Sequence, residues 1–419
     1  MGKKNTRAIS LEEFVETYYK LSPKNTDDEI ADFLGVHKRT LYRYKAEARA
    51  ADLMMSEADE DLITENVKIA KQKQKLQDKR RIENKAFREH ARLENAVAEL
   101  QDEILKLLRE KALPKSAFRK RKITKSKKCG AIVHLTDTHF NELINLMHNK
   151  YDFKIASKRL KKFVDDSKKY LNANNVKDVC ISMTGDLLNS DRRLDEMLSE
   201  ATNRAKAVLL SVTLLEQVIL DFQQDYNVSV AHVVGNESRI TKDIGWVEEV
   251  ASDNYDTIIH GMLKHLFKNS DVIFFDGNSN ERVVEIVGQH ILLQHGHQRR
   301  STNAAQNIQK TKGLYASKGI VIDFIIAGHY HNAKIGDIFA QGGSLAGANA
   351  YSNDALQLES RASQNLHIFF DNGNRDSIKV DLQHVEDVEG YPIDKELEAY
   401  NAKSVDKSKK KVTVHKVVI

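Results

Sequence analysis

The chain has 419 residues, of which 41% are hydrophobic and 30% are charged, and its formal net charge is +5. This length suits two or three domains with a sizeable core. Two cysteines, Cys129 and Cys180, cannot form a disulfide framework and lie in no paired zinc-binding motif, so we expect a reducing, cytoplasmic setting and exclude a zinc finger. No run of about 18 apolar residues predicts a membrane span, and the N-terminus lacks the apolar core of a signal peptide.

Residues 26–44 have the pattern of two short helices joined by a tight turn. Thr26 can cap the first helix, with Glu29 as the return arm of a capping box, and Gly35 supplies the turn. The expected apolar positions are Ile30, Phe33 and Leu34 in the first helix and Leu41 and Tyr44 in the second. The pattern resembles a helix-turn-helix, although a plain helical hairpin with a solvated basic face is the alternative.

The second helix of this pattern would be the one that enters the major groove of DNA. Its outward-facing candidate contacts are His37, Lys38, Arg39, Thr40 and Arg43. Nucleic-acid binding is therefore the prediction for an N-terminal domain at residues 1–58.

A long helix is expected over residues 59–113, because residues 62–113 contain no glycine or proline. Apolar residues at spacings of four and three predict a coiled-coil seam, and they are Leu93, Val97, Leu100, Ile104 and Leu107. We expect this stalk to form a homodimer, as helix-turn-helix proteins commonly do. The stretch 68–92 has ten Lys or Arg against three acidic residues, so it either lies along phosphates or is only solvated.

The rest of the chain divides by composition into three parts. Residues 114–128 form an expected linker, since 115–128 contains eight basic residues and no acidic one. An α/β domain is expected at 129–390 and a lysine-rich tail at 391–419.

Five strand-like runs within 129–390 deliver polar residues at or just past their carboxyl ends, where open α/β sheets place their sites. The runs and the residues that follow them are 131–135 with Asp137 and His139, 179–183 with Gly185 and Asp186, 228–234 with Gly235 and Asn236, 290–294 with His295 and Gly296, and 324–327 with Gly328, His329 and His331. Alternate residues of an extended chain point the same way, so Asp137 and His139 can converge on one point. Carboxylates combined with imidazoles suit a divalent transition metal.

These five motifs together resemble those of the calcineurin-like metallophosphoesterases over residues 131 to about 385. The resemblance implies an α/β fold with two mixed β-sheets packed as a sandwich and flanked by helices. It also implies that Asp137, His139 and His331 bind one metal, that Asn236, His295 and His329 bind a second, and that Asp186 bridges the two. Manganese is the first expectation for the two divalent ions, with iron or zinc as alternatives.

One position departs from the family pattern, in which histidine usually follows the asparagine. This chain has Glu237 there, and it would act as a catalytic acid only if it stayed protonated, whereas nearby cations lower a carboxyl pKa. Arg239 and His297 are the alternative candidates for contacts to the phosphate. A loop of small residues at 342–352 is expected either to approach the substrate or to form only a tight turn.

These features predict a cytoplasmic two-metal phosphodiesterase that cleaves DNA, with an N-terminal DNA-binding module and a helical stalk that forms a homodimer. Two alternatives stay open. One is a phosphatase or small-nucleotide phosphodiesterase whose N-terminal half serves only assembly. The other is a DNA-binding adaptor or regulator that has lost turnover through Glu237.

Overall fold

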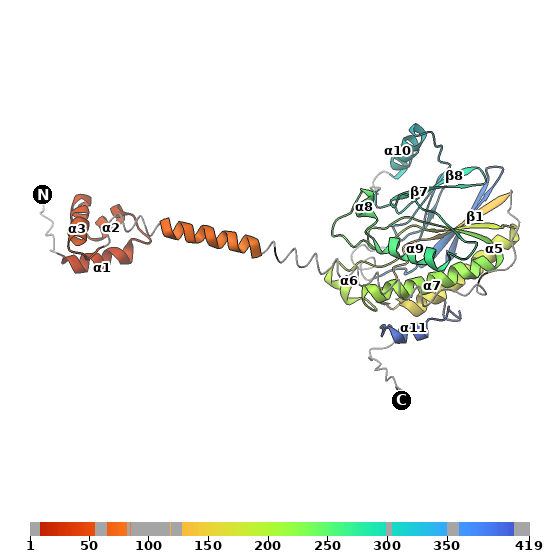
Figure 1. Cartoon of the computed structure of the whole chain (residues 1–419), viewed down its shortest axis with the longest axis horizontal. Coiled ribbons are helices and arrows are strands. Elements are labelled where there is room, and N and C mark those ends of the chain that lie inside the picture. The colour runs from red at the N-terminus through yellow and green to blue at the C-terminus, as the bar shows by residue number, and fades with distance from the viewer. Residues whose placement is uncertain are drawn as a thin grey trace, which may run out of the picture. The chain divides into compact units, whose positions relative to one another are not determined.

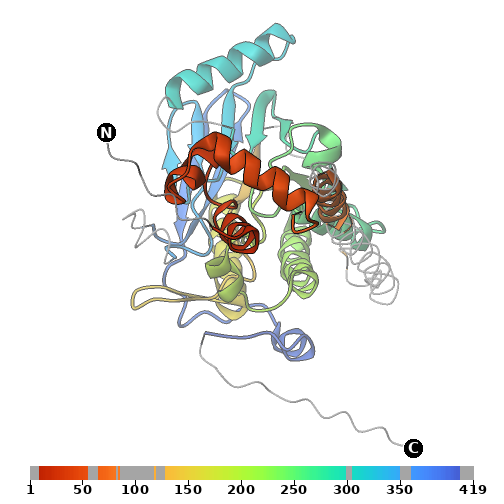
Figure 2. The same cartoon turned by 90° about the vertical axis from the view of Figure 1, so that its left-hand side faces the viewer.

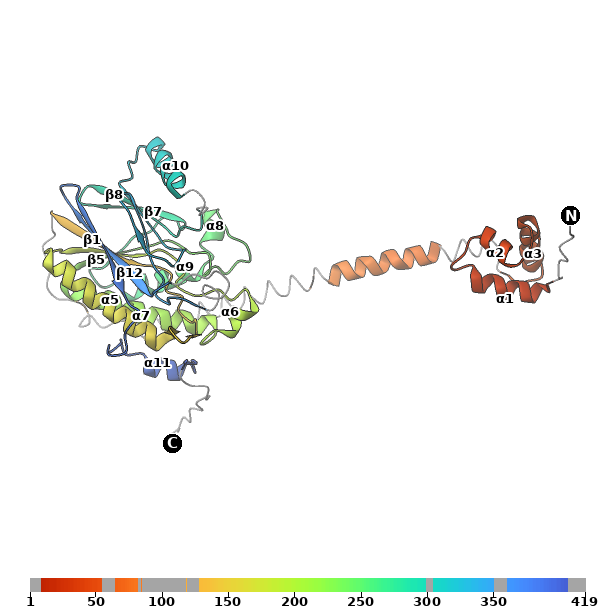
Figure 3. The same cartoon turned by 180° about the vertical axis from the view of Figure 1, so that it is seen from behind.

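The computed structural model describes residues 9–54, 65–81, 84, 118, 128–298, 304–349 and 360–405. The chain divides into two compact units, residues 1–99 and 100–419, which are drawn in Figures 1 and 3. None of the described helices combines the length and the hydropathy of a membrane span.

The described part of the N-terminal unit begins with the helices α1 (Leu11–Leu21), α2 (Asp27–Phe33) and α3 (Lys38–Ala50). The predicted capping box is confirmed, because the Thr26 hydroxyl accepts a hydrogen bond from the Glu29 N–H while the Glu29 carboxylate accepts one from the Thr26 N–H. Helix α1 was not predicted from the sequence. Its Ser10 cap and its amphipathic pattern place two aromatic rings toward α2 and α3.

The core of this unit is formed by Phe14, Tyr18, Ile30, Ala31, Leu41, Ala48 and Met54. The prediction for Phe33 was wrong, since this side chain is 70% exposed. The buried face of α2 runs through Ile30, Ala31 and Leu34, which leaves Phe33 on the opposite flank of a seven-residue helix.

Residues 65–81 are helical with exposed side chains, which agrees with the start of the predicted long helix. The predicted seam from Leu93 to Leu107 lies outside the described residues, as does the linker apart from Phe118 and Lys128. Phe118 is buried, and its ring centroid lies 5.8 Å from that of Phe267 in the core of the second unit. Phe118 of the predicted linker therefore packs against that core.

The second unit is a sandwich of two mixed sheets, which confirms the predicted fold class (Figure 1). The first sheet has the order β13-β12-β1-β4-β5-β6. Its strands are β1 (Cys129–Leu135), β4 (Asp178–Met183), β5 (Asn227–His232), β6 (Ile273–Phe274), β12 (Ser363–Phe370) and β13 (Arg375–Asp381). β1, β4, β5 and β6 run parallel, whereas β12 is antiparallel to both of its neighbours.

The second sheet has the order β10-β11-β9-β8-β7. Its strands are β7 (Glu281–Ile286), β8 (Gln289–Gln294), β9 (Phe324–Ala327), β10 (Lys334–Ile335) and β11 (Phe339–Gln341). β8, β9 and β11 are parallel, and β7 and β10 are antiparallel to their neighbours. A short hairpin of β2 (Ile144–Asn145) and β3 (Lys150–Tyr151) lies outside both sheets.

Helices cover the outer faces of the sandwich. The longer ones are α5 (Phe153–Ala173), α7 (Arg204–Asp225), α9 (Tyr255–Leu266) and α10 (Ala304–Ser317), and the shorter ones are α6 (Leu194–Leu198), α8 (Glu248–Ala251) and α11 (Asp394–Ala399). α5 and α7 lie side by side in Figures 1 and 3, and α10 and α11 lie at opposite ends of the unit in Figure 2.

β1 shows why the middle strands of the sheet carry apolar residues on both faces. Ala131, Val133 and Leu135 pack in the core under the helices, and Ile132 packs between the two sheets. The same core continues into residues expected to begin the tail, since Tyr391, Ile393 and Leu397 are buried there.

Candidate metal centre

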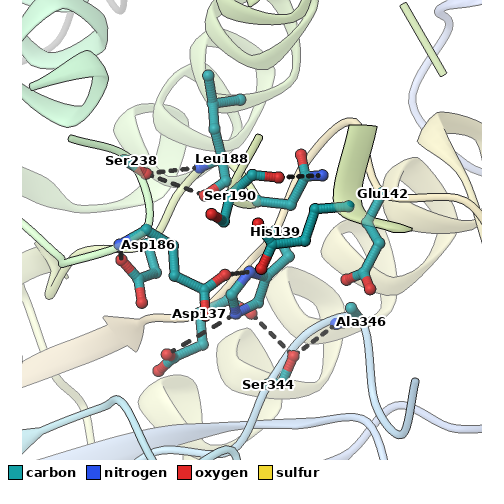
Figure 4. Close-up of polar contacts among 12 residues, drawn as sticks. Asp137, His139, Glu142, Asp186, Leu188, Ser190, Ser238, Ser344 and Ala346 are labelled. Atoms are coloured by element: carbon teal, nitrogen blue, oxygen red, sulfur yellow. Dashed lines mark hydrogen bonds and ion pairs between the residues drawn. The ribbon is translucent and has the colours of Figure 1, made fainter. Parts of the chain in front are cut away.

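The loops that follow five strands meet at one edge of the sandwich. β1, β4 and β5 are neighbours in the first sheet, and β8 and β9 are neighbours in the second. Because the two sheets pack face to face, the carboxyl ends of both sets of strands point into the same space. Figure 4 shows Asp137, His139 and Asp186 together in the middle of this space.

Asp137, His139 and His331 form a first group of possible metal ligands. The Nε2 atoms of His139 and His331 lie 2.9 Å apart, and His331 Nε2 lies 3.3 Å from Asp137 Oδ1. Ligand atoms about 2.1 Å from a shared ion lie roughly 3.0–3.4 Å from one another in octahedral or tetrahedral geometry, so a divalent cation fits these three donors. The Asp137 carboxylate is held in place by a hydrogen bond of 2.9 Å that it accepts from the N–H of His329.

Asp186, His295 and His329 form a second group. His295 Nδ1 donates to the carbonyl of Thr184 at 2.7 Å, which directs Nε2 toward Asp186 Oδ2 at 2.9 Å and Asn236 Oδ1 at 3.1 Å. An imidazole nitrogen that faces two acceptor oxygens needs a proton or a cation between them, and a carbonyl on the other nitrogen is the usual partner of a metal-bound histidine. The donor set therefore fits a second metal ion.

The electrostatics of the centre favour a cation. Burial opposes the ionisation of Asp137, but the neighbouring His331 and His295 outweigh it and lower its pKa to about 2. Burial likewise opposes the charged form of Asp186, yet His295 and His139 hold its pKa well below the ordinary value. Burial lowers the pKa of His139, but the carboxylates around it raise that pKa to about 10. The carboxylates are thus ionised at neutral pH and attract positive charge.

Five of the proposed ligands have a left-handed backbone. The φ angles are 47° at Asp137, 46° at His139, 52° at Asp186, 77° at His329 and 54° at His331. This conformation costs a non-glycine residue on the order of 1 kcal/mol or more and persists only where surrounding contacts impose it, typically at functional sites. Here the Asp137 N–H donates to the Gly185 carbonyl and the His139 N–H donates to the Asp186 carbonyl, both at 3.1 Å.

Two motif glycines stand directly against the carboxylates. A Cβ atom at Gly235 would lie 2.0 Å from Asp186 Oδ1, and one at Gly328 would lie 2.3 Å from Asp137 Oδ2. Neither position has room for a side chain, so the glycines allow the backbone to approach each carboxylate closely.

Glu237 contacts both groups of ligands. Its N–H donates to Asp186 Oδ1 at 2.7 Å, and its carboxylate lies 3.3 Å from His139 Nδ1. Burial raises the pKa of Glu237, but the charge and hydrogen bond of His139 outweigh this and lower it below the ordinary value. An ionised Glu237 can accept a hydrogen bond from His139 Nδ1 and so orient that ring. It cannot donate a proton, which the catalytic-acid role considered from the sequence requires. With His139 and Asp186, Glu237 also forms a third group of possible ligands.

Arg239 and His297 lie beside the centre in different environments. The Arg239 guanidinium donates to the backbone carbonyls of Asn236 and Lys242 and so braces its own loop. The His297 ring centroid lies 5.4 Å from that of His295, and neither of its nitrogens has a hydrogen-bond partner among the described residues. Of the two, His297 has ring nitrogens without a partner among the described residues, and both nitrogens are buried.

Two further residues of the site were missed from the sequence. Arg192 donates to the carbonyls of Glu237 and Asn236, both at 3.1 Å, and adds a second guanidinium at this loop. Asp256 accepts hydrogen bonds from the N–H groups of Asp186 at 3.1 Å and Gly235 at 2.9 Å, and so ties the loops after β4 and β5 together. Asp256 lies in the first turn of α9, where an acidic residue is expected in any helix, so its sequence context carried no signal.

The loop of small residues at 342–349 is hydrogen-bonded to the backbone of Asp137. The Ser344 hydroxyl donates to the Asp137 carbonyl at 3.0 Å, as Figure 4 shows, and the Leu345 N–H donates to the same oxygen at 3.1 Å. The buried Arg159 guanidinium donates to two carbonyls of the loop at 2.8 and 2.9 Å. These contacts favour a structural turn at residues 342–349 over a loop that approaches the substrate.

Replacing Arg159 with methionine is expected to lower the free energy of unfolding by about 3–5 kcal/mol, because the loop carbonyls lose a buried charged donor. Urea unfolding followed by circular dichroism would measure the change. The matched control is Lys169→Met on the same helix, whose side chain is 75% exposed, and it should leave the unfolding midpoint in place. Equal midpoints for both variants would contradict the proposed support of the loop.

The candidate DNA contacts of the N-terminal unit lie along α3. His37 caps this helix, since its Nδ1 accepts from the Arg39 N–H at 3.2 Å. Lys38 pairs with Asp28 at 2.8 Å, and Arg43 lies 3.6 Å from Glu47. Thr40 is half-buried, whereas the side chains of Arg39 and Arg43 are exposed.

Comparisons with known proteins give structural neighbours alone. No protein-family model and no curated protein matches the chain. Vps29 from Entamoeba histolytica, solved with Zn²⁺, is 13% identical, with 60% of this chain and 99% of that chain covered and a TM-score of 0.28. A predicted phosphoesterase from Streptococcus pneumoniae is 15% identical, with 63% and 94% covered and a TM-score of 0.27. A purple acid phosphatase from yellow lupin is 13% identical, with 70% and 58% covered and a TM-score of 0.30.

Proposed function

We propose that this chain is a two-metal phosphodiesterase of the calcineurin-like metallophosphoesterase type and that its substrate is DNA. The observation that carries the proposal is the convergence of five strand ends from two sheets on adjacent groups of buried carboxylates and imidazoles. The motif pattern of the sequence supports the same assignment.

Two divalent ions, with manganese ranked first and iron or zinc next, fit the donor set. Asp137, His139 and His331 would hold one ion, Asn236, His295 and His329 the other, and Asp186 would lie between them. When bound, such ions lower the pKa of water and stabilise negative charge on phosphoryl oxygens.

The protein groups around this centre have distinct parts in the proposed reaction. Glu237 orients His139 through Nδ1 and leaves Nε2 for a metal. His297 is assigned as the hydrogen-bond donor to the leaving oxygen, since its ring lies 5.4 Å from that of His295 and its two buried nitrogens lack a partner among the described residues. Arg192 and Arg239 add positive charge where the phosphates of a strand would pass, and the contacts of Arg239 to backbone carbonyls keep it beside the centre.

Purified protein with Mn²⁺ should cleave plasmid or linear DNA and a small phosphodiester, and a chelator should abolish both reactions. Cleavage of the small ester but not of DNA would support a phosphatase or small-nucleotide phosphodiesterase in place of a nuclease. Bound metal without turnover of any substrate would support a DNA-binding regulator.

The DNA-binding module is part of the same proposal, with α3 as the helix that contacts DNA and residues 59–113 as the stalk of a homodimer. The exposed side chains of Arg39 and Arg43 support it. Replacing both with alanine should weaken DNA affinity and reduce its salt dependence while small-ester turnover stays unchanged, because each phosphate contact releases counterions.

The control is the double variant Lys20→Ala with Lys24→Ala, which removes the same charge from exposed positions in and just after α1. Fluorescence anisotropy with labelled duplex at several salt concentrations would compare the two. Equal affinity losses in both double variants would contradict a specific role for α3.

A further inference from the structure

Trp246 is the single tryptophan of the chain, and its side chain is 59% exposed. It lies in the segment that leads from the Asn236 loop to α8, and three apolar neighbours there are exposed by 41–64%, namely Ile244, Val247 and Val250. Contiguous exposed apolar side chains on a protein surface commonly mark a binding site, and an exposed indole beside three such side chains forms a patch of this kind. The proposed function gives this surface no role.

The indole lies next to the metal centre. Its ring stacks on the imidazole of His297, with centroids 5.3 Å apart and planes 25° apart. The His297 ring in turn lies 5.4 Å from the ring of His295 and 6.3 Å from that of His329. A single imidazole therefore separates the indole from two proposed metal ligands.

The segment that carries the indole is held by defined contacts. The Ile240 N–H donates to the Asp253 carbonyl at 3.1 Å, and the Glu248 carboxylate accepts from the Ser279 N–H at 2.9 Å. A Cβ atom at Gly245 would lie 2.4 Å from Val250 Cγ1, so the chain turns tightly just before the indole. The aromatic surface is thus positioned before any ligand arrives.

Positive charge accompanies this aromatic surface. The guanidinium groups of Arg192 and Arg239 both donate to the Asn236 carbonyl, ten residues before Trp246 on the same segment. Aromatic side chains combined with arginine are the means by which proteins bind unpaired nucleotides, since a base can stack on the ring while phosphates follow the cations. A base inside a duplex has no free face to offer.

We propose that Trp246 is a stacking platform for an unpaired nucleobase next to the scissile phosphate. The substrate class is then a DNA strand with unpaired bases at the cleavage site, such as a single strand or a frayed end, in preference to an intact duplex. This inference rests on the proposed nuclease function and specifies its substrate.

The test uses the full-length chain and the fluorescence of its one tryptophan. Titration of the metal-free protein with a single-stranded oligonucleotide should quench the emission saturably, at the concentration where anisotropy of the labelled oligonucleotide reports binding. Trp246→Ala should weaken binding about 10- to 100-fold, and Trp246→Phe should restore most of it, because either ring can stack on a base. Tyr170→Ala, which removes a 44% exposed aromatic side chain from α5, is the matched control and should bind normally.

Cleavage by the Mn²⁺-loaded protein gives a second readout. The wild type should prefer the single strand over the duplex, and the preference should shrink in Trp246→Ala and for an oligonucleotide with abasic sites at the scissile bond. DNA cleavage without quenching of the wild-type emission and with unchanged affinity in the variants would overturn the platform alone. Wild-type protein that cleaves a small diester but neither binds nor cuts DNA would overturn the proposed function as well. A mononucleotide bound as tightly as the strand would overturn the strand substrate. A changed oligomeric state with unchanged DNA affinity would assign the patch to a protein contact and also overturn the proposal.

Discussion

Replacing Asp186 with asparagine should reduce phosphoester hydrolysis by more than about 100-fold, because residues that only orient a metal ligand already contribute 10- to 100-fold. Asp186 is 1% exposed, lies 2.9 Å from His295 Nε2 and accepts the N–H of Glu237. Asparagine keeps the shape of the side chain but loses the charge that two cations would share.

Metal content measured by mass spectrometry after dialysis, together with turnover of a small diester, would test this expectation. The control is Asp376→Asn, an exposed carboxylate on β13 of the same unit, which should bind metal and turn over normally. Full metal content and full activity in the Asp186 variant would remove the basis of the two-metal assignment. A thermal melt checks that the variant is folded.

Replacing Gly235 with alanine should have a comparable effect without removing any ligand. The new methyl group would stand 2.0 Å from Asp186 Oδ1, so either the carboxylate or the Asn236 loop must move. Misplacement of a catalytic group by about 1 Å is enough to cost on the order of 100-fold in rate. The expected result is weaker metal binding and much lower kcat in a protein that still folds.

Gly261→Ala in α9 is the matched control, since nothing lies within 4 Å of the position of its Cβ atom. Alanine in a helix interior is favoured over glycine by about 0.5–1 kcal/mol, so this variant should be slightly more stable and fully active. Equal activity in both alanine variants would show that the loop tolerates displacement and would contradict the tight fit at Gly235.

The Glu237→His variant tests the position at which this chain differs from the sequence pattern that it resembles. Glu237 lies 3.3 Å from His139 Nδ1, so its removal frees that imidazole while the Asn236 contact to His295 remains. The structure places Glu237 where it can orient His139, whereas the sequence analysis considered it only as a catalytic acid.

The sequence determined the strands and the order of the chemical groups. Apolar runs at 131–135, 179–183, 290–294 and 324–327 fall within β1, β4, β8 and β9, and the polar residues follow each strand as predicted. The periodicity of apolar residues and the positions of turn-forming residues are local properties, so they can be read from a single sequence. The capping box at Thr26 is of the same kind.

The tertiary structure decided which groups support the centre. Asp256 binds the loops after β4 and β5 from a helix far along the chain, Arg159 holds the loop under Asp137, and Trp246 stacks on His297. It also turned Phe33 outward, because burial depends on the neighbouring helices and not on residue type alone. Local patterns place a residue on a helix, strand or loop, but long-range packing determines which group the residue contacts. For that reason the proposed ligands could be predicted from the sequence, whereas the residues that hold them in place and the proposed stacking role of Trp246 could not.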